Sequence, residues 1–573
     1  MTRSAREIRE EIIATVLRNG GHLASSLGAV ELSMALAEAF DPERDRVVWD
    51  VGHQAYAWKI LTGRGGRFGS IRTLGGLSPF LDPAESPADA AVSGHAGSAL
   101  SVALGLAAAR DRRGGSEHVV AVVGDASMAN GHSLEALNNC AAETKKLIVV
   151  LNDNEMSISR SVGSLSRVLA RLTSGVRYNR AKNAVKAAGR ALRLSFIYRP
   201  VHGLKRILKT MVLGDLWFEQ FGLHYLGPVD GHDPAALASA LAAAKAEPRS
   251  VVVHVVTRKG KGYAPAEQDP VKYHGVSPVA PVAPGERPRT WSEEFGAALS
   301  ELARKDERVV ALTAGMRDGT GLAGFAREFP DRFFDVGIAE GHLVAFAAGL
   351  AAGGLRPFVA VYSTFLQRAV DQVMHDVCIS RLPVVICVDR AGIVGADGAT
   401  HQGLYDYAML RCLPNLEIVQ PKDAPDLAAA LGEALERGGP TVVRYPRGAA
   451  PAALEVPPPP AGAKFAIWAP GDALAKAIAV AGEVGGCEVV HARSLKPFDA
   501  ERLARQRAAG MKIVSIENGS LAGGFGEAIG ADLRFGWPDV FVPHGRIDEL
   551  ERKYSLDAGA IAAALVGERE RGG

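Results

Sequence analysis

The chain has 573 residues, of which 47% are hydrophobic, and its 65 Lys and Arg nearly balance its 63 Asp and Glu. This length predicts three or four domains with sizeable cores, and the balanced charge argues against nucleic acid as a partner. The five cysteines are scattered and lack a CxxC spacing, which favours reduced thiols in a cytoplasmic protein over zinc ligands or disulfides. The charged first residues differ from a signal peptide, and no hydrophobic run approaches 18 residues, so we expect no membrane span.

Short hydrophobic runs alternate with Ala- and Leu-rich helical patterns along the whole chain. Continuous runs of this length are typical of parallel strands that are covered on both faces. The alternation therefore predicts an α/β fold of doubly wound, mainly parallel sheets. The predicted strands include residues 118–123, 146–151, 250–256, 382–388 and 439–445.

Two Pro-rich segments, 279–289 and 451–463, have the composition of linkers and predict the domain boundaries. They divide the chain into three domains, residues 1–285, 286–452 and 462–573. A basic segment from 160 to 209 lacks strand signals, and we interpret it as a helical or mobile excursion of the first domain.

Polar residues follow two of the predicted strands. Asp125 comes after the strand at 119–123, and residues 152–154, Asn-Asp-Asn, come after the strand at 147–151. Each ending alone is more often a turn. However, Asp125 and Asn154 lie 29 residues apart, which is enough for a turn, a helix over 132–143 and a returning strand. Two adjacent strands could then offer a carboxylate and an amide oxygen to one Mg²⁺ ion.

The motif "GDAS…NDNEMSIS" resembles the GDG…NDN signature of thiamine diphosphate enzymes of the transketolase-like type. The resemblance implies three doubly wound domains of that type, with thiamine diphosphate and Mg²⁺ as cofactors. It implies that Asp125, Asn154 and the backbone carbonyl of Met156 bind the metal on the cofactor diphosphate. Ala126 replaces a glycine that is usual in these enzymes, and we expect weakened rather than lost binding.

A second motif, residues 334–351, predicts a strand end followed by a helix with Glu340 in its first turn. A carboxylate at this position is more often a helix-dipole or capping group. The stretch is similar to the one that carries the catalytic glutamate of transketolase-like enzymes, which activates the cofactor through its aminopyrimidine ring. By the same resemblance Phe365 stacks on the pyrimidine, and Tyr362 and Arg368 line the same cleft.

Longer blocks resemble the 1-deoxy-D-xylulose-5-phosphate synthase family, and they are more specific than the short metal motif. The blocks are residues 21–36, 48–64, 226–233, 258–276, 389–416 and 444–448. This resemblance implies decarboxylation of pyruvate and ligation of the remaining two-carbon unit to D-glyceraldehyde 3-phosphate. The product would be 1-deoxy-D-xylulose 5-phosphate, a precursor in isoprenoid, thiamine and pyridoxal synthesis. It also implies a homodimer whose subunits bind the cofactor between their first two domains.

The same resemblance assigns roles to individual residues. It gives a catalytic role to Glu340, His53, His401, His274 and Lys259. It gives cofactor binding to His53, Gly94, His95, Gly124, Asp125, Ala126, Ser127, Asn154, Met156, Lys259, Glu340, Phe365 and Arg368. It gives substrate binding to His53, Tyr362, Arg390, Asp397, His401 and Arg447, of which the two arginines hold the substrate phosphate.

Two alternatives stay open at this point. One is a transketolase-type enzyme with a ketose donor, although the blocks at 48–64 and 389–416 disfavour it. The other is a divergent paralogue with another acceptor or no turnover, because residues 96–99 and 312–316 and Ala126 depart from the family pattern. In the third domain, the Gly-Phe-Gly at 524–526 favours tight strand–helix packing over dinucleotide binding.

Overall fold

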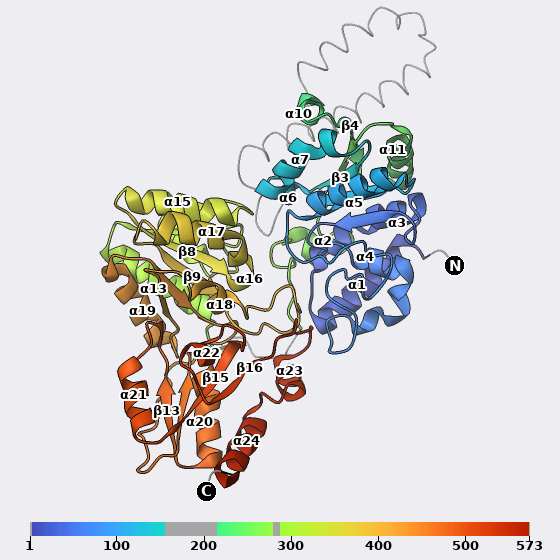
Figure 1. The fold of residues 1–573 in the computed structure, drawn as a ribbon. Helices are drawn as coiled ribbons and strands as arrows, with labels where there is room; N and C mark the ends of the chain where they lie inside the picture. The colour runs from blue at the N-terminus through green and yellow to red at the C-terminus, as the bar shows by residue number, and fades with distance from the viewer. Residues whose placement is uncertain (1–2, 155–214, 279–286, 572–573) are drawn as a thin grey trace, which may run out of the picture. The chain divides into compact units, whose positions relative to one another are not determined.

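The computed structural model describes residues 3–154, 215–278 and 287–571, so the segment at 160–209 lies outside the described residues. The chain divides into two compact units, one of residues 1–72 and 76–280 and the other of residues 73–75 and 281–573 (Figure 1). No helix in the described ranges is both long enough and hydrophobic enough for a membrane crossing.

The first unit contains a sheet of five parallel strands in the order β1-β2-β3-β5-β4. The predicted strands at 118–123, 146–151 and 250–256 are confirmed as β2, β3 and β5. The bounds are β1 (Arg46–Trp49), β2 (Val119–Gly124), β3 (Ile148–Asp153), β4 (His224–Asp230) and β5 (Val251–Val256).

Helices cover both faces of this sheet, as its continuous hydrophobic strands predict. Alternate residues of β2 enter separate cores: Val119, Ala121 and Val123 pack with α5 and α7, whereas Val120 and Val122 pack with α3 and α11 (Figure 1). The helices of this unit are α1 (Ala5–Asn19), α2 (Leu23–Gly28), α3 (Val30–Ala39), α4 (Tyr56–Lys59), α5 (Ala99–Arg113), α6 (Asp125–Met128), α7 (Gly131–Glu143), α10 (Asp215–Gln220), α11 (Pro234–Ala246) and α12 (Ala264–Gln268).

The second unit contains two sheets, one of seven strands in the order β14-β10-β11-β9-β8-β6-β7 and one of four in the order β13-β12-β15-β16. All pairings are parallel except that of β14 with β10. The strands are β6 (Val309–Thr313), β7 (Phe333–Asp335), β8 (Arg356–Tyr362), β9 (Val385–Asp389), β10 (Glu417–Val419), β11 (Thr441–Arg444), β12 (Phe465–Ala469), β13 (Cys487–His491), β14 (Ser494–Lys496), β15 (Lys512–Ser520) and β16 (Leu533–Trp537).

The predicted fold class, α/β with mainly parallel sheets, is confirmed by these three sheets. The boundaries of the three predicted domains stay a prediction. One element crosses the predicted second boundary, because β14 follows β13 of the four-stranded sheet but pairs with β10 of the seven-stranded one. The two sheets of this unit are therefore joined through backbone hydrogen bonds as well as through the chain.

Amphipathic helices build the cores of the second unit. One face of the seven-stranded sheet packs with α13, α14 and α19, and α20 and α24 pack on the four-stranded sheet (Figure 1). Helix α13 begins with a capping box in which Thr290 and Glu293 satisfy each other's backbone amides. The helices are α13 (Trp291–Lys305), α14 (Ala323–Glu328), α15 (Glu340–Ala352), α16 (Ser363–Leu366), α17 (Val370–Gln372), α18 (Asp406–Leu410), α19 (Ala424–Arg437), α20 (Ala473–Val484), α21 (Ala500–Ala508), α22 (Phe525–Ala528), α23 (Ile547–Lys553) and α24 (Ala558–Arg571).

Candidate active site

The predicted metal ligands of the first unit lie at neighbouring strand ends. Asp125 directly follows β2 and is buried, and Asn154 directly follows β3. Strands β2 and β3 are adjacent and parallel, with Gly124 opposite Asn152, so both endings lie at the carboxyl edge of the sheet. The third predicted ligand, Met156, lies outside the described residues.

Two of the three polar residues after β3 hold the fold together. The Asn152 amide donates to Gln54 Oε1 at 2.7 Å and accepts from Thr257 Oγ1 at 2.7 Å. The Asp153 carboxylate lies 2.9 Å from Nε2 of the buried His254. Both side chains thus satisfy buried polar partners. Asn154, one residue further and partly exposed, is the member of the trio whose predicted role is metal binding.

A buried cation accompanies Asp125. Lys259 is only 6% exposed, and burial lowers the pKa of its ammonium group to about 8 although the Asp125 carboxylate opposes this shift. A Cβ atom at Gly124 would have no other residue within 4 Å, so there is open space beside this backbone. A carboxylate and open backbone after β2, with an ammonium group after β5 at the same edge of the parallel sheet, fit a metal ion together with a diphosphate.

Three histidines form a cluster in the first unit. The ring centres of His53 and His274 are 5.5 Å apart, and His22 lies 6.0 and 5.6 Å from them. Burial lowers the pKa of both His53 and His274 well below 6.5, so these imidazoles are neutral at pH 7. Nδ1 of His53 is buried without a hydrogen-bond partner among the described residues, which fits a polar ligand beside it.

His22 is a member of this cluster that the sequence analysis did not predict. Its only signal is its place within the block at 21–36, just before α2. Nothing local in the sequence separates it from a structural histidine, because His53 and His274 come from distant segments.

The predicted cofactor segment with Gly94 and His95 continues into a tight turn at Gly97. The Gly97 amide donates to both carboxylate oxygens of Asp50, at 2.8 and 2.9 Å, with φ at +87°. A Cβ atom on Gly97 would lie 2.4 Å from Oδ1 of Asn130, which caps the N-terminus of α7. The glycine at this position, one of the departures from the family pattern, therefore has a local structural reason.

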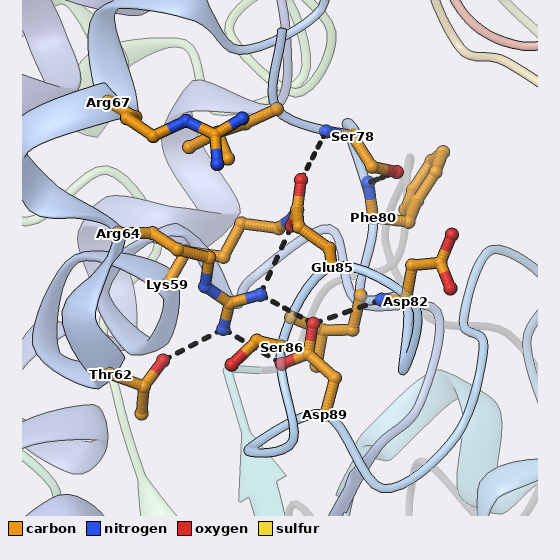
Figure 2. A network of polar contacts seen from close by, with 12 residues as sticks. Lys59, Thr62, Arg64, Arg67, Ser78, Phe80, Asp82, Glu85, Ser86 and Asp89 are labelled. Atoms are coloured by element: carbon orange, nitrogen blue, oxygen red, sulfur yellow. Dashed lines mark hydrogen bonds and ion pairs between the residues drawn. The ribbon is translucent and has the colours of Figure 1, made fainter.

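A buried ion-pair network holds the loop that leads into this segment (Figure 2). The Arg64 guanidinium donates to both oxygens of Asp89, at 2.6 and 2.8 Å, and to Glu85 Oε2 at 3.1 Å. Lys59, at the end of α4, pairs with the same Glu85 oxygen. Burial lowers the pKa of Lys59, whereas the Glu85 carboxylate opposes that shift.

The two carboxylates of this network also bind the loop backbone. Asp89 accepts the amide of Asp82 at 3.0 Å, and Glu85 accepts the amide of Ser78 at 2.7 Å, as Figure 2 shows. Between these two amides lies Phe80, whose ring centre is 5.6 Å from that of His22. The network therefore fixes a loop that reaches the histidine cluster.

The second unit contains the other predicted site residues. Glu340 is the first residue of α15 and is 4% exposed, which confirms its predicted place in the first helical turn. Phe365 lies in α16, one turn after the end of β8, and Arg368 follows it by one further turn.

Four of these residues lie around one aromatic pair. The rings of Tyr362 and Phe365 are stacked with centres 5.8 Å apart, and the His401 ring meets Phe365 edge-on at 5.6 Å. The Arg390 guanidinium lies 3.9 Å from the centre of the Tyr362 ring. The structure thus brings Tyr362, Phe365, Arg390 and His401 together. The predicted place of Arg368 in the same cleft as Tyr362 and Phe365 stays a prediction.

A second arginine lies against the same loop. Arg447 Nη1 is 3.7 Å from an Asp397 oxygen and 3.5 Å from the Val394 carbonyl. His401 Nδ1 is 3.0 Å from the hydroxyl of Thr400. Two guanidinium groups, an imidazole and a carboxylate, on this loop and against it, have the chemistry to bind a phosphorylated aldehyde.

Part of the second unit matches a known family of domains. The family model "Transketolase, pyrimidine binding domain" matches residues 287–452, which contain Glu340, Phe365 and Arg390. These residues therefore belong to a class of domain that is named after the transketolases. Among solved structures, the chain is similar to a transketolase from Campylobacter jejuni with 17% identity, 98% coverage of each chain and a TM-score of 0.46.

The particular family follows from the first half of the chain and from full-length relatives. The model "1-deoxy-D-xylulose-5-phosphate synthase" matches residues 1–257. A protein of that name from Geobacter sulfurreducens is 45% identical over 98% of this chain and 95% of its own length. One from Thermomicrobium roseum is 46% identical over 98% and 93%. The chain belongs to the 1-deoxy-D-xylulose-5-phosphate synthase family.

Proposed function

We propose that this protein decarboxylates pyruvate and joins the remaining two-carbon unit to D-glyceraldehyde 3-phosphate, with 1-deoxy-D-xylulose 5-phosphate and CO₂ as products. The observation that carries the proposal is similarity to synthases of that name at 42–46% identity over nearly the whole chain. Thiamine diphosphate, when bound, supplies the nucleophilic carbon and the electron sink that decarboxylation requires.

The strand ends of the first unit are the proposed cofactor site. Asp125 and Asn154, with the Met156 carbonyl, would bind Mg²⁺, and Lys259 would pair with the diphosphate. The fit rests on the buried carboxylate, the nearby ammonium group and the open space beside Gly124. The further proposed contacts to the cofactor come from His53, Gly94, His95, Ala126 and Ser127.

Glu340 is the proposed proton-sharing group of the second unit. Its buried carboxyl group, at the start of α15, would hydrogen-bond the aminopyrimidine ring of the cofactor and share a proton with that ring. Phe365, beside Tyr362, would stack on the same ring, with Arg368 one turn further along.

The histidines are the proposed proton donors and acceptors for the substrate oxygens. Because His53 and His274 are neutral at pH 7, each can accept a proton at one ring nitrogen and donate from the other. His401 would act on the acceptor aldehyde, with Asp397 beside it. Arg390 and Arg447 would bind the acceptor phosphate through their guanidinium groups.

The proposed reaction uses pyruvate as its donor substrate, whereas ketol transfer uses a ketose, so the two reactions can be separated by their donors. Purified protein with thiamine diphosphate, Mg²⁺ and glyceraldehyde 3-phosphate is given either pyruvate labelled at C1 or a ketose phosphate. We expect labelled CO₂ and deoxyxylulose phosphate, identified by NMR, in equal amounts from pyruvate, and no product from the ketose. Turnover of the ketose alone would establish a transketolase, and turnover of neither would contradict the proposal. A folded Glu340→Gln variant serves as the inactive control.

On the basis of the family, we further propose that the protein is a homodimer and that it acts in the cytoplasm. Its product would be used in the synthesis of isoprenoid precursors and thiamine. The dimer is tested by light scattering of the full chain, where a mass near twice 60.2 kDa is expected.

A further inference from the structure

The loop at 389–404 connects β9 to α18 and carries three of the proposed substrate residues, Arg390, Asp397 and His401. It contains the positive-φ glycines Gly392, Gly395 and Gly398, and its two ends are joined by backbone hydrogen bonds between Gly392 and Gly403. These bonds fix the internal shape of the loop but not its position relative to the four-stranded sheet. Its position must come from what it packs against.

One side chain of the four-stranded sheet binds this loop directly. Asn518, on β15, accepts a hydrogen bond through Oδ1 from the Ile393 amide at 2.9 Å. The same oxygen accepts from Trp537 Nε1 at 3.0 Å, and Nδ2 donates to Asp472 Oδ2 at 2.7 Å. Because an indole can only donate, these partners fix which side of the amide is oxygen.

The fit between the loop and Asn518 leaves no spare room. A Cβ atom on Gly392 would lie 2.3 Å from Asn518 Nδ2, and one on Gly398 would lie 3.1 Å from the His544 side chain. Ile393 and Leu404 of the loop share a small hydrophobic core with Trp537, Val542, Leu550 and Leu556. The polypeptide beyond the seven-stranded sheet thus forms the support of the loop.

The contact made by Asn518 lies next to the contact made by Arg447. Asn518 binds the amide of Ile393, and Arg447 Nη1 is 3.5 Å from the carbonyl of the following residue, Val394. Arg390 lies three residues before Ile393, with its guanidinium over Tyr362. The backbone at 393–394 therefore connects Asn518 with both arginines proposed to bind the phosphate.

We propose that Asn518 is a positioning residue for recognition of the acceptor phosphate: its hydrogen bond to Ile393 sets the loop that aligns Arg390 and Arg447. This inference rests on the proposed function of the two arginines. It gives the third part of the chain a role in substrate selection.

The test compares D-glyceraldehyde 3-phosphate with D-glyceraldehyde, which lacks the phosphate, as acceptors. For Asn518→Ala we expect kcat/KM with the phosphorylated acceptor to fall about tenfold, as for one lost buried hydrogen bond. The value with D-glyceraldehyde and the KM for pyruvate should stay within twofold of wild type. An equal fall with both acceptors, or no fall with either, would overturn the inference.

A compensating pair of substitutions separates positioning from a general loss of structure. Asn518→Asp keeps the acceptor oxygen for Ile393 but places two carboxylates together, and Asp472→Asn then returns a donor to that contact. We expect the double variant to regain most of the preference for the phosphorylated acceptor. Lys512→Ala, which removes the ion pair of Lys512 with Glu568 in the same part of the chain, should leave this preference unchanged.

If the wild type makes no product from either acceptor, that result contradicts the proposed function alone. Hydrogen exchange can still test the role of Asn518 in that case. Exchange at the Ile393 and Val394 amides should be faster in Asn518→Ala than in wild type, with residues of β12 unchanged. Equal exchange in the two proteins would refute the role of Asn518 without bearing on the reaction.

Discussion

Lys259 is the residue whose charge should govern cofactor affinity. Burial lowers its pKa to about 8, so the ammonium is charged at pH 7 and largely neutral at pH 9. If it pairs with the cofactor diphosphate, affinity must fall as pH rises through about 8, because the neutral amine has to regain a proton on binding. We predict that thiamine diphosphate binds about tenfold more weakly at pH 9 than at pH 7, measured by calorimetric titration with Mg²⁺ present.

The matched variant for this prediction is Lys259→Arg. A guanidinium group keeps its charge over the whole range, so its titration should show no loss of affinity between pH 7 and 9. A wild-type affinity that is flat over this range, or an equal fall in the variant, would show that Lys259 does not bind the diphosphate.

At the scale of elements, the network of Figure 2 should be a major source of stability in the first unit. Asp89 is buried and receives two bonds from Arg64. Its loss would leave a buried cation without its main partner. We predict that Asp89→Asn destabilises the protein by about 3–5 kcal/mol, measured by urea denaturation.

An exposed ion pair provides the comparison for Asp89. Arg6 and Glu10 form an i,i+4 pair on the surface of α1, so Glu10→Gln should change stability by less than about 1 kcal/mol. Similar small effects for both substitutions would mean that the buried network does not hold the loop.

Glu517, on β15, should give the second unit a pH-dependent stability. Its oxygens accept the amides of Phe525 and Gly526 at 2.7 and 2.8 Å, and burial raises its pKa to about 7 despite these bonds. The folded carboxyl holds its proton between pH 4.5 and 7, whereas the unfolded one has lost it. Stability therefore falls as pH rises through this range, by about 3 kcal/mol for this group.

Glu517→Gln removes that titration. We predict that the denaturation midpoint of the wild type falls more steeply between pH 5 and 7.5 than that of the variant, whatever the absolute stability of the variant. Parallel pH profiles would contradict the raised pKa of Glu517.

The same turn contains the Gly-Phe-Gly motif at 524–526. A Cβ atom on Gly526 would lie 2.0 Å from Ser515 Oγ, and one on Gly524 would lie 2.1 Å from the Ser520 carbonyl. The Gly-Phe-Gly therefore serves tight strand–helix packing, as predicted, and its amides bind a carboxylate of the protein itself.

At the scale of the whole molecule, the regular elements were predictable because their signals are local. Hydrophobic runs gave β2, β3, β5, β9 and β11, and the helical period placed Glu340 in the first turn of α15. The residues missed were those whose role depends on distant partners. His22 meets His53 and His274, Asn518 meets Ile393, and the three-residue strand β14 crosses to another sheet.

The site could be predicted only in part for the same reason. Spacing indicated that Asp125 and Asn154 follow adjacent strands, and the pairing of β2 with β3 confirms this adjacency. Spacing could not show which of the polar residues after β3 form hydrogen bonds within the fold. That distinction required the partners of Asn152 and Asp153, which come from residues 54, 254 and 257.

Asp125, at the end of β2, is proposed to bind a divalent cation that holds thiamine diphosphate. Calorimetric titration of the full chain with thiamine diphosphate, in the presence of Mg²⁺ or of a chelator, measures this role of Asp125. We predict binding of one cofactor per chain with Mg²⁺, and affinity lowered at least about 100-fold by the chelator or by Asp125→Ala. Equal affinity under all three conditions would contradict metal binding by Asp125.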